Sequence, residues 1–123
     1  MKGILWLSLN SQISLVDYVH KPVNHLHVTL QFGVNREDWV HLIGRSVEVV
    51  SVANCYNNKV QALRVNLPEE FDAICGNVHP HMTISTAENV RPVESNNMFS
   101  GEYNELSVEF VMQTTVEFFE FKK

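Results

Sequence analysis

The chain has 123 residues, of which 45 % are hydrophobic and 19 % are charged, and its formal net charge is −5 at pH 7. This length is typical of one domain, so we expect a single domain over residues 1–123, and the apolar content argues against wholesale disorder. The negative charge argues against a protein that binds long duplex nucleic acid through its phosphates, whereas a small or terminal phosphate needs only local positive potential.

The N-terminal segment MKGILWLSLN predicts a first strand over residues 2–9, because it is rich in branched and aromatic residues. Its apolar run is too short for the core of a signal peptide and lacks a small-residue cleavage site. No stretch approaches the roughly 18 consecutive apolar residues of a membrane-spanning helix. The two cysteines, Cys55 and Cys75, form no motif of secreted proteins. We therefore expect a cytoplasmic protein without a membrane partner.

The elements expected up to residue 67 follow from apolar spacing and turn residues. Two stretches that alternate as strands do are separated by Tyr56-Asn57-Asn58, which predicts a hairpin with an Asn-rich turn. In chain order we expect a short helix over residues 11–19, a strand over 26–32, a short helix over 36–43, and hairpin strands over 45–55 and 59–67.

The second half begins with a brief helix expected over residues 68–74, started by Pro68 and ended before Gly76. A strand follows at HPHMTI, and the polar residues 86–101 predict the longest loop of the chain. The remaining residues alternate again and predict two more strands or one bent pair. Together these elements predict an α+β chain of six or seven strands with two or three short helices.

A repeated motif is the main feature of the sequence. HLHVTL and HPHMTI both contain H-x-H-x-T, beginning at His25 and at His79. Successive side chains of a strand point to opposite faces, so both histidines and the threonine of each copy share one face, with apolar residues on the other. The repeat predicts two similar halves, each of which contributes one motif strand to a shared cleft.

The residue types on that face suit acid–base chemistry at a phosphate. Imidazoles titrate near neutral pH, so one can take a proton from water while another gives a proton to a leaving oxygen. Threonine hydroxyls can donate hydrogen bonds to phosphoryl oxygens. Two alternatives remain open: four histidines around a zinc or copper ion, and a non-catalytic protein that binds phosphorylated RNA ends.

The paired motif resembles the signature of the 2H phosphoesterase superfamily, H-x-T-[LI] twice in one small domain. The matches are His27-Val28-Thr29-Leu30 and His81-Met82-Thr83-Ile84. Within this superfamily, the stretches PHMTISTAENVRPVESNN and NNKVQALRV are most similar to the cyclic phosphodiesterase domain of fungal and plant tRNA ligases. The resemblance covers roughly residues 25 to 100, and the chain shows no kinase or ligase module.

The resemblance implies a fold, a site and a reaction. The fold would be α+β and bilobal, with two pseudo-symmetric lobes of antiparallel strands and short helices around a central cleft. The reaction would be hydrolysis of RNA 2′,3′-cyclic phosphate ends to a 2′-phosphate and a 3′-hydroxyl, without a metal or another cofactor. The implied catalytic residues are His27 and His81, and the implied phosphate-binding residues are Thr29 and Thr83.

Further substrate-binding candidates lie outside the motifs. They are two cations that could supply positive potential, Lys59 and Arg64, and two polar residues of the long loop, Ser95 and Asn96. The substrate partner is an RNA 3′ terminus or a small nucleotide. The same catalytic residues would also serve a 2H enzyme that degrades signalling nucleotides, such as 2′,5′-oligoadenylates or cyclic oligonucleotides, to counter host defence. The sequence leaves the substrate, the acid and base roles of the two histidines, and the oligomeric state open.

Overall fold

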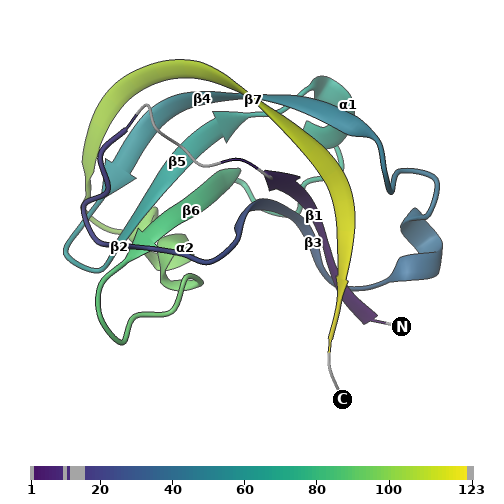
Figure 1. Ribbon diagram of the computed structural model, residues 1–123, viewed down its shortest axis with the longest axis horizontal. Helices are drawn as coiled ribbons and strands as arrows, with labels where there is room; N and C mark the ends of the chain where they lie inside the picture. Colours follow the sequence, from purple (N-terminus) through teal and green to yellow (C-terminus); the bar gives the residue numbers. More distant parts are fainter. Residues whose placement is uncertain (1, 10, 12–15, 122–123) are drawn as a thin grey trace.

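The computed structural model describes residues 2–9, 11 and 16–121, and strands dominate it. Over these residues the strands are β1 (Lys2–Leu9), β2 (Lys21–Pro22), β3 (Leu26–Asn35), β4 (Ser46–Tyr56), β5 (Val60–Asn66), β6 (His81–Thr86) and β7 (Asn104–Glu120) (Figure 1). The helices are short: a 3-10 helix η1 (Arg36–Trp39), and the α-helices α1 (Glu69–Asp72) and α2 (Glu94–Met98). None of the described helices is long and apolar enough to cross a membrane.

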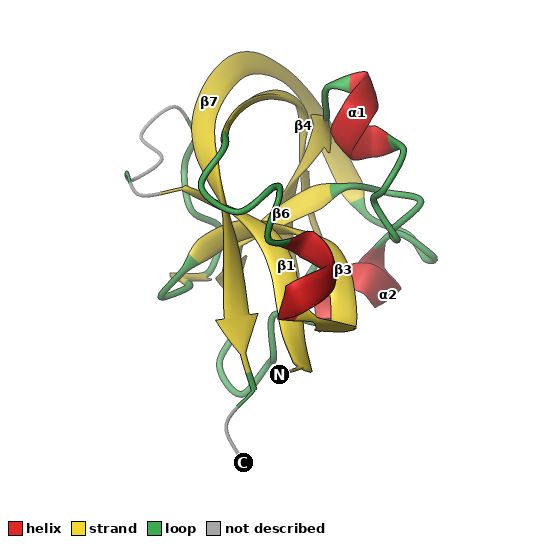
Figure 2. Cartoon of the chain, turned by 90° about the vertical axis from the view of Figure 1, so that its right-hand side faces the viewer, coloured by secondary structure: helices red, strands yellow, loops and turns green. Residues whose placement is uncertain are grey.

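Six of the strands close into an antiparallel barrel. Neighbours pair in the order β6-β3-β1-β7-β4-β5, and β5 then pairs with β6, while the short β2 adds to the free end of β6. Figure 2 shows these strands curving around one axis, with the short helices at the periphery. The expected α+β fold with two lobes is therefore wrong, because the chain forms one mostly β barrel.

Two pairings explain why the halves do not separate into lobes. β7, in the C-terminal half of the chain, is one long bent strand whose N-terminal part pairs with β4 and whose C-terminal part pairs with β1, both from the N-terminal half (Figure 1). Elsewhere in the barrel, β3 of the N-terminal half pairs with β6 of the C-terminal half, with Val28 opposite Met82. Strands from both halves thus share one continuous set of backbone hydrogen bonds and one core.

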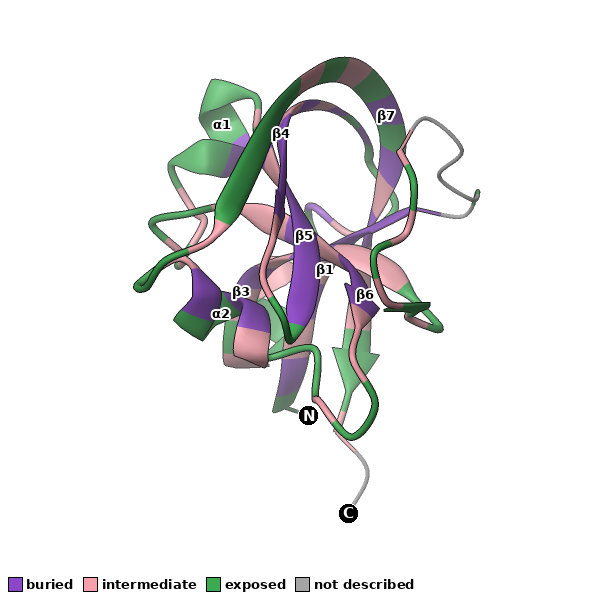
Figure 3. Cartoon of the chain, turned by 90° about the vertical axis from the view of Figure 1, so that its left-hand side faces the viewer, coloured by how far each residue is buried: buried purple, intermediate pink, exposed green. Residues whose placement is uncertain are grey.

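The core lies inside the barrel, and the motif strands face it with their apolar residues. Val28 and Leu30 of β3, and Met82 and Ile84 of β6, are at most 1 % exposed, as alternation along a strand predicts. Figure 3 shows that buried residues occur along several strands, among them β4, β5 and β6. Because the buried residues alternate with the motif histidines and threonines, burial fixes which way the polar face points.

The other predicted elements agree with the structure in part. The hairpin is confirmed as β4 and β5, and the helix expected over residues 68–74 forms as α1. The helix expected over 36–43 is only the 3-10 turn η1, and the loop expected over 86–101 contains the unpredicted α2. Residues 12–15 of the helix expected over 11–19 lie outside the described residues, and residues 16–19 are not helical.

Gly3 of β1 lies so close to β7 that there is no room for a side chain. A Cβ placed there would lie 2.0 Å from the backbone oxygen of Phe119 and 2.8 Å from a ring carbon of Phe118. We expect Gly3→Ala to lower the free energy of unfolding by about 1–3 kcal/mol, as overpacking does, because backbone atoms must separate. Urea denaturation measures this change. The matched control is Gly101→Ala, whose Cβ would meet nothing closer than 3.9 Å, and equal effects of the two substitutions would contradict the close approach.

Candidate active site

The two motifs meet because β3 and β6 are neighbours in the barrel, with Val28 opposite Met82. This register brings the outward faces of both motifs together. They line a cleft of about 1000 Å³, whose walls include all four motif residues predicted to act on substrate: His27, Thr29, His81 and Thr83. The cleft also takes in His25 and His79, so both complete H-x-H-x-T copies face it.

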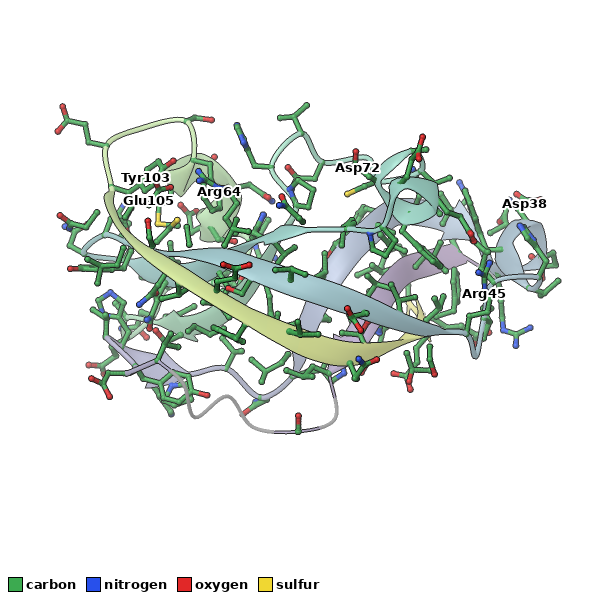
Figure 4. All side chains as sticks on the ribbon, turned by 90° about the horizontal axis from the view of Figure 1, so that it is seen from above. Asp38, Arg45, Arg64, Asp72, Tyr103 and Glu105 are labelled. Atoms are coloured by element: carbon green, nitrogen blue, oxygen red, sulfur yellow. The ribbon has the colours of Figure 1, made fainter. Side chains whose placement is uncertain are left out.

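The further substrate-binding candidates divide into two groups. Ser95 and Asn96 of α2 line the cleft, and the side-chain oxygen of Asn96 accepts a hydrogen bond from Asn77 at 3.0 Å. Lys59 and Arg64 are not among the residues that line it. Arg64 instead forms an ion pair of 2.7 Å with Glu105 of β7 (Figure 4), and Lys59 is exposed in the turn between β4 and β5.

His81 uses both ring nitrogens in hydrogen bonds. Its Nδ1 lies 2.7 Å from the carbonyl oxygen of His79, so Nδ1 carries a proton, because a carbonyl can only accept. Its Nε2 lies 2.9 Å from the Oγ of Ser95. Burial lowers the pKa of His81 below its usual 6.5, although the bond to the backbone of His79 acts in the opposite direction.

Ser95 also contacts the second functional group of this motif. Its Oγ lies 2.7 Å from the Oγ1 of Thr83 and donates to the carbonyl oxygen of Pro92 at 2.9 Å. Only 1 % of Ser95 is exposed. A single hydroxyl of α2 thus contacts both His81 and Thr83 in the cleft.

His27 is held by a different set of contacts. Its Nδ1 lies 3.1 Å from the Nδ1 of His25, whose Nε2 lies 2.9 Å from the Oγ of Ser8 on β1. The pKa of His27 is lowered to about 4, first by burial and then by the charges of His25 and His81. The charge of His81 therefore reaches His27 across the cleft, but it lowers the pKa of His27 less than burial does.

Each motif packs against an aromatic ring that the sequence did not single out. The ring of Trp6 lies 4.1 Å from that of His27 and 4.7 Å from that of His25, measured between centroids. Phe99 lies 5.0 Å from His81 in the same way. Trp6 could have been found from the alternation of residues 2–9, because it falls on the face opposite the buried Leu5 and Leu7.

The arrangement places four imidazole rings and several hydroxyls at one cleft. Among the described residues, no group of three or more His, Cys, Asp or Glu side chains is placed so that it could hold a metal ion. The imidazoles of His27 and His81 can exchange protons with a bound molecule. The hydroxyls of Thr29 and Thr83 can donate hydrogen bonds to an anion that lies between the two motifs. The structure therefore brings together, in one cleft, the residues from which acid–base chemistry at a phosphate was predicted.

Comparison with known proteins agrees with the motifs. The family model of the fungal tRNA ligase phosphodiesterase domain matches residues 19–122, which include both H-x-H-x-T copies and α2. This match confirms the predicted resemblance and extends it beyond residues 25 to 100. No curated protein matches the chain.

Proposed function

The chain belongs to the family of fungal tRNA ligase phosphodiesterase domains, and we propose that it hydrolyses the 2′,3′-cyclic phosphate of an RNA end. The family implies a cyclic phosphodiesterase. The products are a 2′-phosphate and a free 3′-hydroxyl. The observation that carries the proposal is that β3 and β6 place an imidazole and a threonine hydroxyl from each motif around one cleft.

The proposed reaction uses the two histidines as a proton-transfer pair. One imidazole takes a proton from water as the water oxygen attacks phosphorus. The bond between phosphorus and O3′ breaks, and O3′ receives a proton from the other imidazole, so proton uptake and release balance. The first ring then releases its proton to solvent and the second regains one.

The threonines bind the phosphoryl oxygens in this proposal. Thr29 and Thr83 follow their histidines by two residues and share the same strand face, so each hydroxyl lies beside the ring of its own motif. Hydrogen bonds from preorganised donors to the charged oxygens stabilise the transition state more than the ground state, as negative charge grows on them.

The proposal predicts turnover of a defined substrate without added metal. The purified protein, with excess chelator, should convert an RNA oligonucleotide ending in 2′,3′-cyclic phosphate to a 2′-phosphate product, as resolved by mass and terminal chemistry. Parallel reactions contain a 2′,5′-oligoadenylate and a cyclic dinucleotide. Cleavage of only these signalling nucleotides would contradict RNA end healing, and binding of the RNA end without turnover would contradict the enzyme.

A further inference from the structure

The hydroxyl of Ser95 lies where the proposed function would place a phosphoryl oxygen of the substrate. Its Oγ lies 2.9 Å from the Nε2 of His81 and 2.7 Å from the Oγ1 of Thr83. These are the two atoms of the second motif that would face a phosphoryl group. Both distances are typical of hydrogen bonds, so an oxygen placed there contacts both groups at once.

The rest of α2 is anchored, which fixes the backbone of Ser95. Met98, one turn further along α2, is 2 % exposed and packs with Cys55 and Val60 of the barrel. On the exposed side, Asn96 accepts a hydrogen bond from Asn77. A rotation of the Ser95 side chain between staggered conformations can vacate the position without displacing the helix.

The hydrogen bonds of Ser95 are not all compatible with a neutral His81. Nδ1 of His81 carries a proton because it faces a carbonyl, so Nε2 of the neutral ring is an acceptor. Ser95 has one hydroxyl proton, and that proton cannot reach both Nε2 and the carbonyl oxygen of Pro92. When His81 is protonated, Nε2 donates to Ser95 and Ser95 donates to Pro92, and every donor has an acceptor.

A phosphoryl oxygen fits the same position better than the serine hydroxyl. It is anionic and accepts hydrogen bonds only, so it can receive a hydrogen bond from protonated His81 and one from Thr83 together. Such charge-assisted hydrogen bonds are roughly twice as strong as those between neutral groups. The cleft at this point is therefore suited to an anionic oxygen. In the structure the Oγ of Ser95 occupies this position instead.

We propose that Ser95 Oγ fills a phosphoryl-oxygen subsite between His81 and Thr83, and that phosphate ligands compete with this hydroxyl for the two groups. The catalytic consequence rests on the proposed function, whereas the competition itself concerns binding alone. Ser95 accordingly weakens phosphate binding instead of contributing to it, which is the opposite of the behaviour of a substrate-binding residue.

The test is the affinity of Ser95→Ala for inorganic phosphate and for a nucleoside 2′-monophosphate, the proposed product type. Removing the hydroxyl should lower the Kd of both ligands about fivefold, which corresponds to one neutral hydrogen bond. Calorimetry and the NMR signals of the His81 ring measure this change. KM for the cyclic phosphate should fall by a similar factor. The matched control is Asn97→Ala on the same helix, because its side chain donates a hydrogen bond to Glu94 and does not line the cleft.

Ser95→Gly provides a second variant, because it also removes the hydroxyl and leaves the position empty, and it should bind phosphate more tightly than the wild type. Unchanged or weaker binding by the folded variants would overturn the proposal, as would the absence of phosphate binding by all forms. If the wild type hydrolyses no cyclic phosphate, the proposed function fails, and the phosphate titrations still decide the role of Ser95.

Discussion

Replacing either His27 or His81 with alanine should lower kcat/KM for the cyclic phosphate by about 10²–10⁴-fold, the usual contribution of a positioned proton-transfer group. The loss is large because the cleft walls supply one imidazole from β3 and one from β6 for two separate proton transfers. The double variant should be little slower than either single variant, since groups that act as a unit lose their effect together.

The matched control for these substitutions is His41→Ala. His41 is exposed after η1 and does not line the cleft, so its loss should leave turnover unchanged. Circular dichroism and the urea midpoint must show that all four proteins are folded. Turnover that survives in both His27→Ala and His81→Ala would refute the assignment of catalytic residues, whatever the substrate.

The polar face of each motif was predictable because it depends on alternation within one strand. In H-x-H-x-T every second residue shares a face of the strand. Val28 and Met82, which lie between the histidine and the threonine of each motif, are buried in the core, so the histidines and threonines must point outward. Burial also explains why both motifs, though far apart in sequence, end up with the same orientation. The shared cleft additionally requires that β3 and β6 be neighbours, which the repeat suggested but did not dictate.

The closed barrel could not be predicted from the same signals. A repeat indicates two similar halves, yet it says nothing about which strands pair across them. Here one continuous strand, β7, pairs with both β4 and β1, and β5 pairs with β6. Apolar residues alternate from Leu106 to Met112 and again at Phe119 and Phe121, on the other parity, and such a pattern does not distinguish a single bent strand from two strands.

The helix that positions Ser95 was missed for a local reason. Glu94-Ser95-Asn96-Asn97 contains residues that compete with the backbone for hydrogen bonds and favour turns over helix interiors. The short α2 forms nevertheless, because Met98 packs into a small apolar cluster on the barrel. Tertiary packing therefore overrides propensity at this helix, and it brings Ser95 to His81 and Thr83.

The pH dependence of kcat/KM should be bell-shaped, with its maximum on the acid side of neutrality. The proposed reaction needs one imidazole neutral and the other protonated, and kcat/KM reports the pKa values of the free enzyme. The rate should rise with pH near 4, the lowered pKa of His27, and fall above the pKa of His81, which burial holds below 6.5.

At pH values above the pKa of His81, kcat/KM should drop about tenfold per pH unit, because the productive form of the enzyme loses one proton. Since that pKa is below 6.5, kcat/KM at pH 8.5 should be roughly 100-fold or more below its maximum. Initial rates at constant ionic strength from pH 3.5 to 9, with chelator present, measure the profile, and circular dichroism at each pH shows that the barrel remains folded. A rate that still climbs between pH 7 and 9 would mean that hydroxide or another activated water attacks phosphorus without protonated histidine. The acid limb is the more specific test, since a solvent-exposed histidine would place it near 6.5 and not near 4.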